Sequence, residues 1–531
     1  MREDTMLRAK QFATLLVGLL AWCSSVEQAA SAGSTPLDFA LYFDSDVRDA
    51  AECNMAFKDG RLVIGDAVTN PSVTCPDMFA WKLFIDITRQ KWWTMWASDM
   101  ETWPPKPYKL CSGGETDTDC CQPGLPNNPD PTHCPYFPGR ALPGALEARP
   151  ELPPARLLGQ PVGAHAMFFG RGGMEIGLET FGKPGEPEPG RVLRQEVGEI
   201  TVRNKDMFDY IYSNNLYNQQ GIASIYTRNA ENLARNAPYQ LKNEPNAIAR
   251  IDLPPSGIMI KSNWLYYQFA KDVGLKDDPS APYIKKDMIS EVNEKEYKGE
   301  HWLLSFHIST KDVPQWMWAT FEHVNNPGRC DFTGCNDSFG YESPDANRPA
   351  GTAANFTAPH SRSDQLGQAT TIFSLGEPYP SGPISTALKP LFEATGIGTT
   401  DQKVLEPTPS DKGWLSYRLK GTQVNFTNMM GRPTRLGNSV TEGGFMATSS
   451  CVSCHARASI MVPAGQPDHT APALGVFSYD TLSEVGYTQS ASGVPQKDWF
   501  HGSAVKPALR ALQTDFMWGM PFFAKPLVQP N

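Results

Sequence analysis

Residues 451–455 read Cys451-Val452-Ser453-Cys454-His455, and this C-x-x-C-H stretch decides how the rest of the chain is interpreted. In c-type haem attachment, two thiols bond the porphyrin vinyl groups and the adjacent histidine ligates the iron. The spacing suits that chemistry, because two cysteines three positions apart reach neighbouring vinyl groups and place the next residue beneath the iron. We therefore expect one covalently bound haem c, attached through Cys451 and Cys454, with His455 as an axial iron ligand.

Two other kinds of site use a C-x-x-C pair. A redox-active dithiol usually lies near a βαβ pattern, which the sequence around residues 451–455 does not show. Half of a zinc site needs a second, closely spaced Cys/His pair, and this half of the chain lacks one. The haem interpretation is therefore favoured over both.

Length and charge limit the classes of protein to which the chain can belong. It has 531 residues, 40% hydrophobic and 20% charged, which is typical of a globular protein with two or more domains. A haem domain needs about 100 residues, so most of the chain has another role. The net charge is −10 and there is no long basic run, which argues against a nucleic-acid partner.

Residues 1–32 have the three parts of a secretory signal peptide. Arg8 and Lys10 are basic, residues 12–22 are apolar, and Ala30-Ser31-Ala32 is a small-residue cleavage site. The apolar part is too short to span a bilayer, and no later stretch approaches the required length. We expect a periplasmic or secreted mature chain without a transmembrane segment.

The cysteine count agrees with export. Apart from Cys23 and the two cysteines of the haem motif, eight of the 11 remain: Cys53, Cys75, Cys111, Cys120, Cys121, Cys134, Cys330 and Cys335. An even number in an exported chain predicts up to four disulfides. Cys330 and Cys335 are close enough to pair locally, and the group at 111–134 is expected to staple one loop-like stretch. A metal site formed by that group with His133 is the rival interpretation.

The pattern along the chain predicts an α+β fold. We expect a large β-rich domain over residues 33–410, with a disulfide-stapled, Pro/Gly-rich loop region at 104–190. A small, mainly helical haem-binding segment, interwoven with that domain, is expected over residues 411–531. The helix of the haem motif is expected to continue through Ala458 and to carry Met461.

Several segments predict particular elements. Pro76 and Asp77 suit the start of a helix. Residues 302–308 and 414–425 alternate as strands do. Residues 316–323 alternate too, although a short helix after Pro314 is the other interpretation.

A six-coordinate haem needs a second axial ligand. Met520 is the first candidate and Met517 the second, because they lie 65 and 62 positions after His455 in a Met-Pro-Phe context. A thioether ligand would raise the reduction potential relative to a second histidine. Only nine residues follow Phe522, where small cytochromes usually place another helix. The remaining candidates are Met429, Met430, Met446, His307, His323, His469 and His501.

The chain resembles the large, exported, single-haem c-type cytochromes of bacteria. The resemblance runs through most of the mature chain, in these stretches: residues 81–85 (WKLFI), 92–96 (WWTMW), 306–308 (FHI), 315–324 (QWMWATFEHV), 436–438 (LGN) and the haem motif. It implies haem binding and electron transfer, and it supplies no substrate.

Three functions follow from these observations. The first is an exported electron-transfer protein whose redox partner the sequence does not identify. The second is a haem-dependent oxidoreductase with a substrate site in the large domain, for which His307, Glu322 and His323 are the candidate catalytic residues. In a strand, Glu322 and His323 would point to opposite faces. The third is a sensing module with an open iron site.

Overall fold

We describe a computed structural model of the chain. The structure describes residues 49, 52–65, 68–112, 119–123, 132–139, 156–158, 197–235, 250–292, 295–329, 335, 337–339, 383–427, 431, 433–442, 449–473, 493–502 and 508–528. The expected signal peptide at 1–32 and most of the 104–190 loop region lie outside the described residues.

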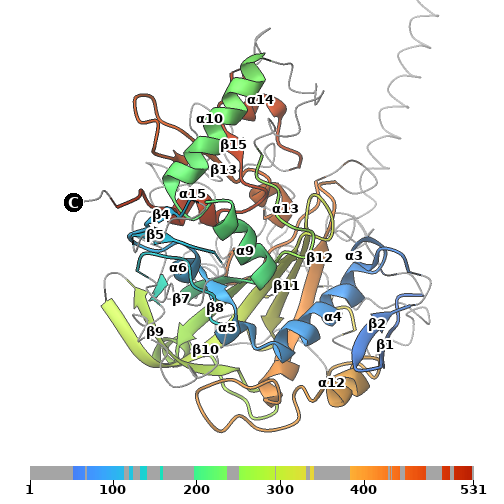
Figure 1. Cartoon of the computed structure of the whole chain (residues 1–531). Coiled ribbons are helices and arrows are strands. Elements are labelled where there is room, and N and C mark those ends of the chain that lie inside the picture. The colour runs from blue at the N-terminus through green and yellow to red at the C-terminus, as the bar shows by residue number, and fades with distance from the viewer. Residues whose placement is uncertain are drawn as a thin grey trace, which may run out of the picture.

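One eight-stranded sheet organises the fold (Figure 1). Its strands are β3 (Ala97–Ser98), β6 (Arg156–Leu158), β7 (Val197–Arg203), β8 (Ile258–Tyr266), β9 (Lys285–Val292), β10 (Lys295–Thr310), β11 (Met317–His323) and β12 (Tyr417–Gln423). The order is β12-β11-β10-β8-β7-β6-β9, with β3 beside β7, and β9 also pairs with β10. Strand β12 comes from the segment in which the haem is expected, so that segment and the large domain share one sheet.

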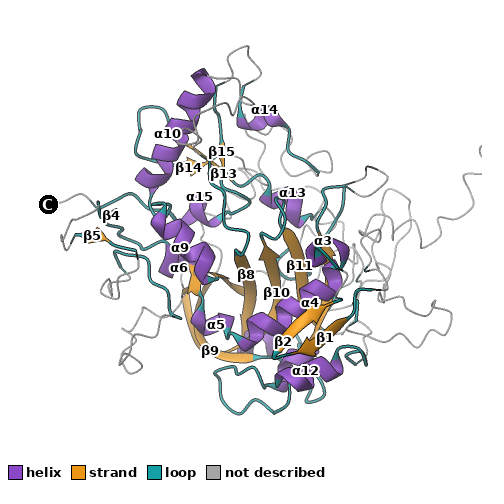
Figure 2. Cartoon of the chain, turned by 45° about the vertical axis from the view of Figure 1, so that its right-hand side comes forward, coloured by secondary structure: helices purple, strands orange, loops and turns teal. Residues whose placement is uncertain are grey.

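The remaining described elements are short or surround this sheet. The other strands are β1 (Met55–Lys58), β2 (Arg61–Ile64), β4 (Lys109–Leu110), β5 (Cys120–Cys121), β13 (Ser459–Met461), β14 (Ala471–Pro472) and β15 (Leu512–Gln513). The helices are α3 (Pro71–Thr74), α4 (Pro76–Arg89), α5 (Trp92–Met95), α6 (Asp99–Thr102), α9 (Lys205–Ser213), α10 (Gln219–Arg235), α11 (Tyr267–Asp272), α12 (Lys389–Thr395), α13 (Cys451–His455), α14 (Lys497–Phe500) and α15 (Gly519–Phe523), with a 3-10 turn at Lys412–Ser416. The C-terminal elements β13, β15, α14 and α15 lie beside α10 (Figures 1 and 2).

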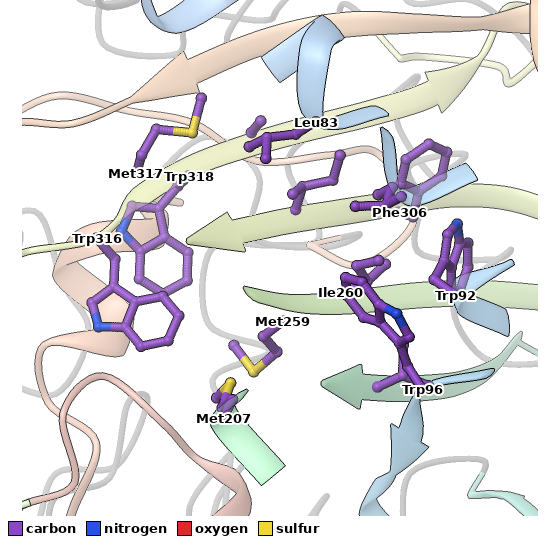
Figure 3. Packing of buried hydrophobic residues seen from close by; sticks show 14 of the residues in the cluster. Leu83, Trp92, Trp96, Met207, Met259, Ile260, Phe306, Trp316, Met317 and Trp318 are labelled. Atoms are coloured by element: carbon purple, nitrogen blue, oxygen red, sulfur yellow. The ribbon is translucent and has the colours of Figure 1, made fainter. Parts of the chain in front are cut away.

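Helix α4 covers the apolar face of the sheet. It begins at Pro76, as the sequence predicts, because proline suits the first helical position and Asp77 suits the positive end of the helix. Phe84 packs on Phe306 of β10 at 5.6 Å and on Phe321 of β11 at 5.1 Å between ring centroids. Aromatic residues supply much of this core, and Figure 3 shows Trp92 and Trp96 beside Ile260 and Phe306.

The opposite face of the sheet is polar although it is largely buried. Antiparallel partners share a face, so the pairs His307–Lys261, His307–Thr320 and Ser305–Glu322 place these side chains together. The residues of this polar face are Lys261, Asn263, Ser305, His307, Thr320, Glu322, Lys420 and Gln423. The segment around α13 covers it, and each buried polar group there needs a partner.

The helices and strands confirm the predicted α+β class. The mainly helical character expected for 411–531 is wrong for its described residues, because the short helices α13, α14 and α15 alternate there with β12, β13, β14 and β15. The strands expected at 302–308 and 414–425 are found in β10 and β12, and residues 317–323 form a strand. The expected continuation of the haem-motif helix through Ala458 is wrong, because α13 ends at His455. The chain turns instead into β13, where Ile460 pairs with Leu512, so sheet pairing outweighs local helix preference. Met461 consequently lies in a strand.

Disulfides staple the N-terminal half, as the cysteine count predicts. The bonds are Cys53–Cys75, Cys111–Cys120 and Cys121–Cys134, and Cys335 is also disulfide-bonded. The rival metal site at 111–134 is therefore wrong, since its thiols are used in disulfides. His133 instead stacks on Tyr108 at 4.1 Å.

Within the described part of the chain, no helix has the length and hydropathy that a membrane crossing requires.

Candidate haem-attachment site

The haem motif forms the short helix α13, which lies at the end of β11 and β12 (Figure 2). The backbone N–H of Val452 donates to the side-chain oxygen of Gln423 at 3.0 Å, and the Gln423 amide donates to the Ser450 hydroxyl at 3.0 Å. Both partners are buried, so these bonds fix the first turn of α13 on the last residue of β12. The motif therefore stands on the sheet and not on a separate loop.

The two thiols of the motif are not joined to each other. Cys451 and Cys454 are free, whereas Cys53, Cys75, Cys111, Cys120, Cys121, Cys134 and Cys335 are all in disulfides. Loss of contact with water raises the pKa of both thiols, that of Cys454 to about 12. Redox-active C-x-x-C pairs instead need a lowered pKa at the attacking sulfur. The environment therefore does not provide the activated sulfur that a redox-active pair needs.

His455 presents one ring nitrogen for a ligand. Its Nδ1 donates to the carbonyl oxygen of Phe516 at 2.8 Å, which leaves Nε2 unprotonated in the neutral ring. Burial lowers the pKa of His455 to about 3, so the ring is neutral. Among the described residues, no hydrogen-bond partner reaches Nε2. Metal-ligating histidines commonly donate their other N–H to a carbonyl in this way.

Trp318 packs beside the imidazole. Its ring centroid lies 4.4 Å from that of His455, with 40° between the planes, and its indole N–H donates to Gln315 at 3.1 Å. Trp318 is the second residue of β11, so a buried strand of the sheet supports the expected iron ligand.

The residues present fit a c-type haem. Free thiols at the required spacing, an imidazole oriented through Nδ1, and an Nε2 that no described residue bonds are the donor set that covalent attachment and iron ligation use. Among the described residues, no group of three or more His, Cys, Asp or Glu side chains is arranged to hold a bare metal ion.

A constrained turn holds the carbonyl that orients His455. Asp515 and Phe516 both have positive φ, 49° and 66°, which is uncommon for residues other than glycine. The Asp515 carboxylate accepts a hydrogen bond from the Leu253 backbone N–H at 2.6 Å and forms an ion pair with Lys311. The Trp316 indole N–H is 3.4 Å from the same carboxylate. Asp515 therefore ties the turn to the rest of the molecule.

Replacing Asp515 by asparagine is expected to lower the free energy of unfolding by about 2 kcal/mol, because charge-assisted hydrogen bonds are lost. Chemical denaturation measures this change. The matched control is Asp252→Asn, since Asp252 is 3.5 Å from the same lysine but is 43% exposed. Equal stabilities of the two variants would contradict a special role for Asp515.

The structure divides the three candidate catalytic residues between the two faces of the sheet. His307 and Glu322 lie on the polar face, and His323 lies on the other, as the strand pattern predicts. The ring of His323 stacks on Tyr283 with 3.5 Å between centroids. Burial lowers the pKa of His323 to about 3, so it is neutral within the core.

Glu322 is occupied by local partners. Its carboxylate accepts hydrogen bonds from the Ser439 backbone N–H at 2.9 Å and from the Ser439 hydroxyl at 2.6 Å. Lys420 lies 3.4 Å from it, and both charged side chains are fully buried. These contacts fix the 439 turn to the sheet.

His307 has a different carboxylate as its neighbour. Glu442 lies 3.5 Å from His307 Nε2, and the Asn438 amide nitrogen lies 3.1 Å from the same atom. Both Glu442 and Asn438 belong to the segment that precedes the haem motif. The pattern of the strand residues alone gives no signal for this pairing.

The second axial ligand stays a prediction. Met517 and Met520 are both fully buried. The Phe516 carbonyl bonds to His455 Nδ1, the nitrogen remote from the expected iron. The backbone at 516–517 therefore lies on the Nδ1 side of the imidazole. Of the other candidates, Met429, Met430 and Met446 lie outside the described residues.

Sequence reasoning did not predict the role of the residues that hold the motif in place. Gln423, Asn438, Glu442, Asp515 and Phe516 act through contacts between distant segments, and none has a spacing signal of its own. Phe516 adjoins the methionine candidates, which is the one local hint that the tail reaches the motif.

Compared with family models, curated proteins and solved structures, the chain matches none of them.

Proposed function

We propose that this chain is an exported c-type cytochrome that transfers single electrons through one covalently bound haem. The observation that carries the proposal is the arrangement of Cys451, Cys454 and His455. The two thiols are free in a chain whose other described cysteines are disulfide-bonded, and the imidazole is oriented through Nδ1. When bound, the haem supplies an iron that cycles between the ferrous and ferric states.

The chain's own residues perform three tasks in this proposal. Cys451 and Cys454 tether the porphyrin, and His455 ligates the iron through Nε2. The Phe516 carbonyl fixes the tautomer and orientation of the imidazole, so Nε2 would face the iron of a bound haem. Trp318 and Gln423 anchor the site to a sheet, and rigid elements position a site better than loops do.

The proposed compartment and architecture have independent support. Disulfides form and persist in oxidising compartments, which fits export to the periplasm or the medium. The haem-binding segment, proposed over residues 411–531, contributes β12 to the large sheet and is thus interwoven with the 33–410 domain. The large domain supports the motif, and its redox partner is a protein that the sequence does not identify.

The test is production in a host that matures c-type cytochromes. Intact-mass measurement is expected to show the polypeptide plus one macrocycle, and absorbance spectra are expected to change reversibly between oxidised and reduced protein. Colourless protein with the mass of the polypeptide alone would overturn the proposal. Rapid carbon monoxide binding without denaturant would exclude a six-coordinate carrier and favour a sensing module, and turnover of a substrate would favour an oxidoreductase.

A further inference from the structure

A histidine–carboxylate pair lies between the sheet and the haem motif. His307, on β10, is 3.5 Å from Glu442 between Nε2 and the carboxylate oxygen. Their side chains are 9% and 14% exposed, so the pair is largely buried but is not sealed from water. Glu442 and Asn438 occupy His307 Nε2, so we do not assign His307 as the second axial ligand, and the pair is separate from the proposed attachment at Cys451 and Cys454 and ligation by His455.

Short contacts connect this pair to the motif. The Cys451 sulfur lies 3.6 Å from the carbonyl oxygen of Leu436, whose own N–H donates to Ser449 at 3.1 Å. Two residues later, Asn438 contacts both His307 and Glu442. On the sheet, Thr320 is the cross-strand partner of His307 and lies on the same face as Trp318, which contacts His455. The pair is therefore one loop away from a haem thioether position.

The surroundings of His307 Nε2 suit both protonation states. The Asn438 amide oxygen accepts from the N–H groups of Val440 and Thr441, so its nitrogen must face His307 as a donor. A neutral His307 can accept that hydrogen bond at Nε2. A protonated His307 can instead donate from Nε2 to Glu442. One nitrogen thus has a donor and an acceptor within reach, which lets it gain or lose a proton without repacking.

Charged groups face His307 from the neighbouring strands and from the covering segment. Lys261, opposite it on β8, forms an ion pair with Glu199 at 2.9 Å. On the neighbouring strands, Glu322 is paired with Lys420. From the covering segment, Glu442 faces His307 directly, and its carboxylate also accepts from the Asn438 N–H at 2.6 Å. Burial would raise the pKa of Glu442, but His307 and that N–H outweigh it and lower the pKa to about 2. A protonated His307 therefore favours the ionised form of Glu442, and the Asn438 N–H and Lys261 favour it independently of His307.

The iron of a haem attached at α13 would lose one positive charge on reduction. We therefore propose that the His307–Glu442 pair is a redox-linked proton site. A bound haem would supply an iron that takes one electron from a one-electron donor and loses one positive charge. On that reduction His307 would bind one proton from water at Nε2 and donate it in a hydrogen bond to Glu442. On reoxidation the electron would pass to an acceptor and His307 would return the proton to water. This inference rests on the proposed function and adds proton uptake to it.

The experiment is a spectroelectrochemical titration of the matured haem protein at a series of pH values. If reduction is coupled to proton uptake, the midpoint potential is expected to fall as pH rises, because the reduced protein holds one more proton. The limit is about 59 mV per pH unit, which is a tenfold change in proton concentration for one electron. His307→Gln is expected to remove this slope, and Glu442→Gln to move it to more acidic pH because the protonated form loses its acceptor.

The control is His301→Gln, the same substitution on the same strand. His301 is buried and bonds to Ser290 and Gly299 at the β9 side, away from the motif. It is expected to keep the wild-type slope. A pH-independent wild-type potential, or a wild-type slope in His307→Gln, would overturn the inference, the latter by assigning the proton to haem propionates. Glu442→Gln provides the test if His307→Gln does not fold. Absence of haem from the mass of the wild type would instead show that the proposed function is wrong.

Discussion

The double variant Cys451→Ala with Cys454→Ala is expected to carry no covalently attached haem after production in a host that matures c-type cytochromes. The reason is that each thiol supplies one thioether bond in the proposed site, and no other free cysteine is found among the described residues. Intact mass after denaturation measures the effect, and the expected loss is complete. Each single substitution leaves one thioether site, so a partial yield of singly attached haem is expected.

His455→Ala separates attachment from ligation. Both thiols remain, so covalent haem is expected in reduced yield, but the iron loses its proximal nitrogen and the absorbance spectrum changes. The matched control removes two other cysteines by Cys111→Ala and Cys120→Ala, which deletes a disulfide closing a nine-residue separation. That variant is expected to lose stability and to keep the haem mass. Haem in the Cys451/Cys454 double variant, equal to that in the control, would contradict the assignment of the thiols.

Short-range sequence patterns predict the C-x-x-C-H motif and much of the sheet. The spacing of Cys451, Cys454 and His455 is a short-range property, and so is the alternation in β10 and β11. The start of α4 at Pro76 follows from proline's fixed φ and its missing N–H. Each of these features depends on residues within one element, where pattern and physics agree.

Contacts between distant segments determine the partner of His307 and the end of α13, which short-range patterns do not predict. The carboxylate beside His307 comes from Glu442, in a segment more than 130 residues later in the chain. The carboxylate among the candidate catalytic residues was Glu322, which instead bonds to Ser439 and pairs with Lys420. The end of α13 is set by pairing of β13 with β15, again between distant segments. Sequence alone does not rank such competing partners, because their energies depend on which surfaces meet.

Replacing Lys420 by methionine is expected to destabilise the fold by about 3–5 kcal/mol, because it leaves a fully buried carboxylate without its cation. Glu322 and Lys420 are 3.4 Å apart and both are 0% exposed. Burial lowers the pKa of Lys420 and the neighbouring Glu322 opposes that shift, so the two charges depend on each other. Chemical denaturation of variants with equal haem content measures the change.

The double variant Glu322→Gln with Lys420→Met distinguishes a buried ion pair from simple loss of packing. It removes both charges, and the glutamine can still bond to Ser439, so its stability is expected to lie closer to wild type than that of Lys420→Met. Lys412→Met is the surface control. Its ion pair with Asp401 spans 2.9 Å, but the side chains are 49% and 78% exposed, so its loss is expected to cost at most about 1 kcal/mol. Additive losses in the double variant would show that Glu322 and Lys420 stabilise the 439 turn independently, and the polar face would then hold the covering segment through hydrogen bonds alone.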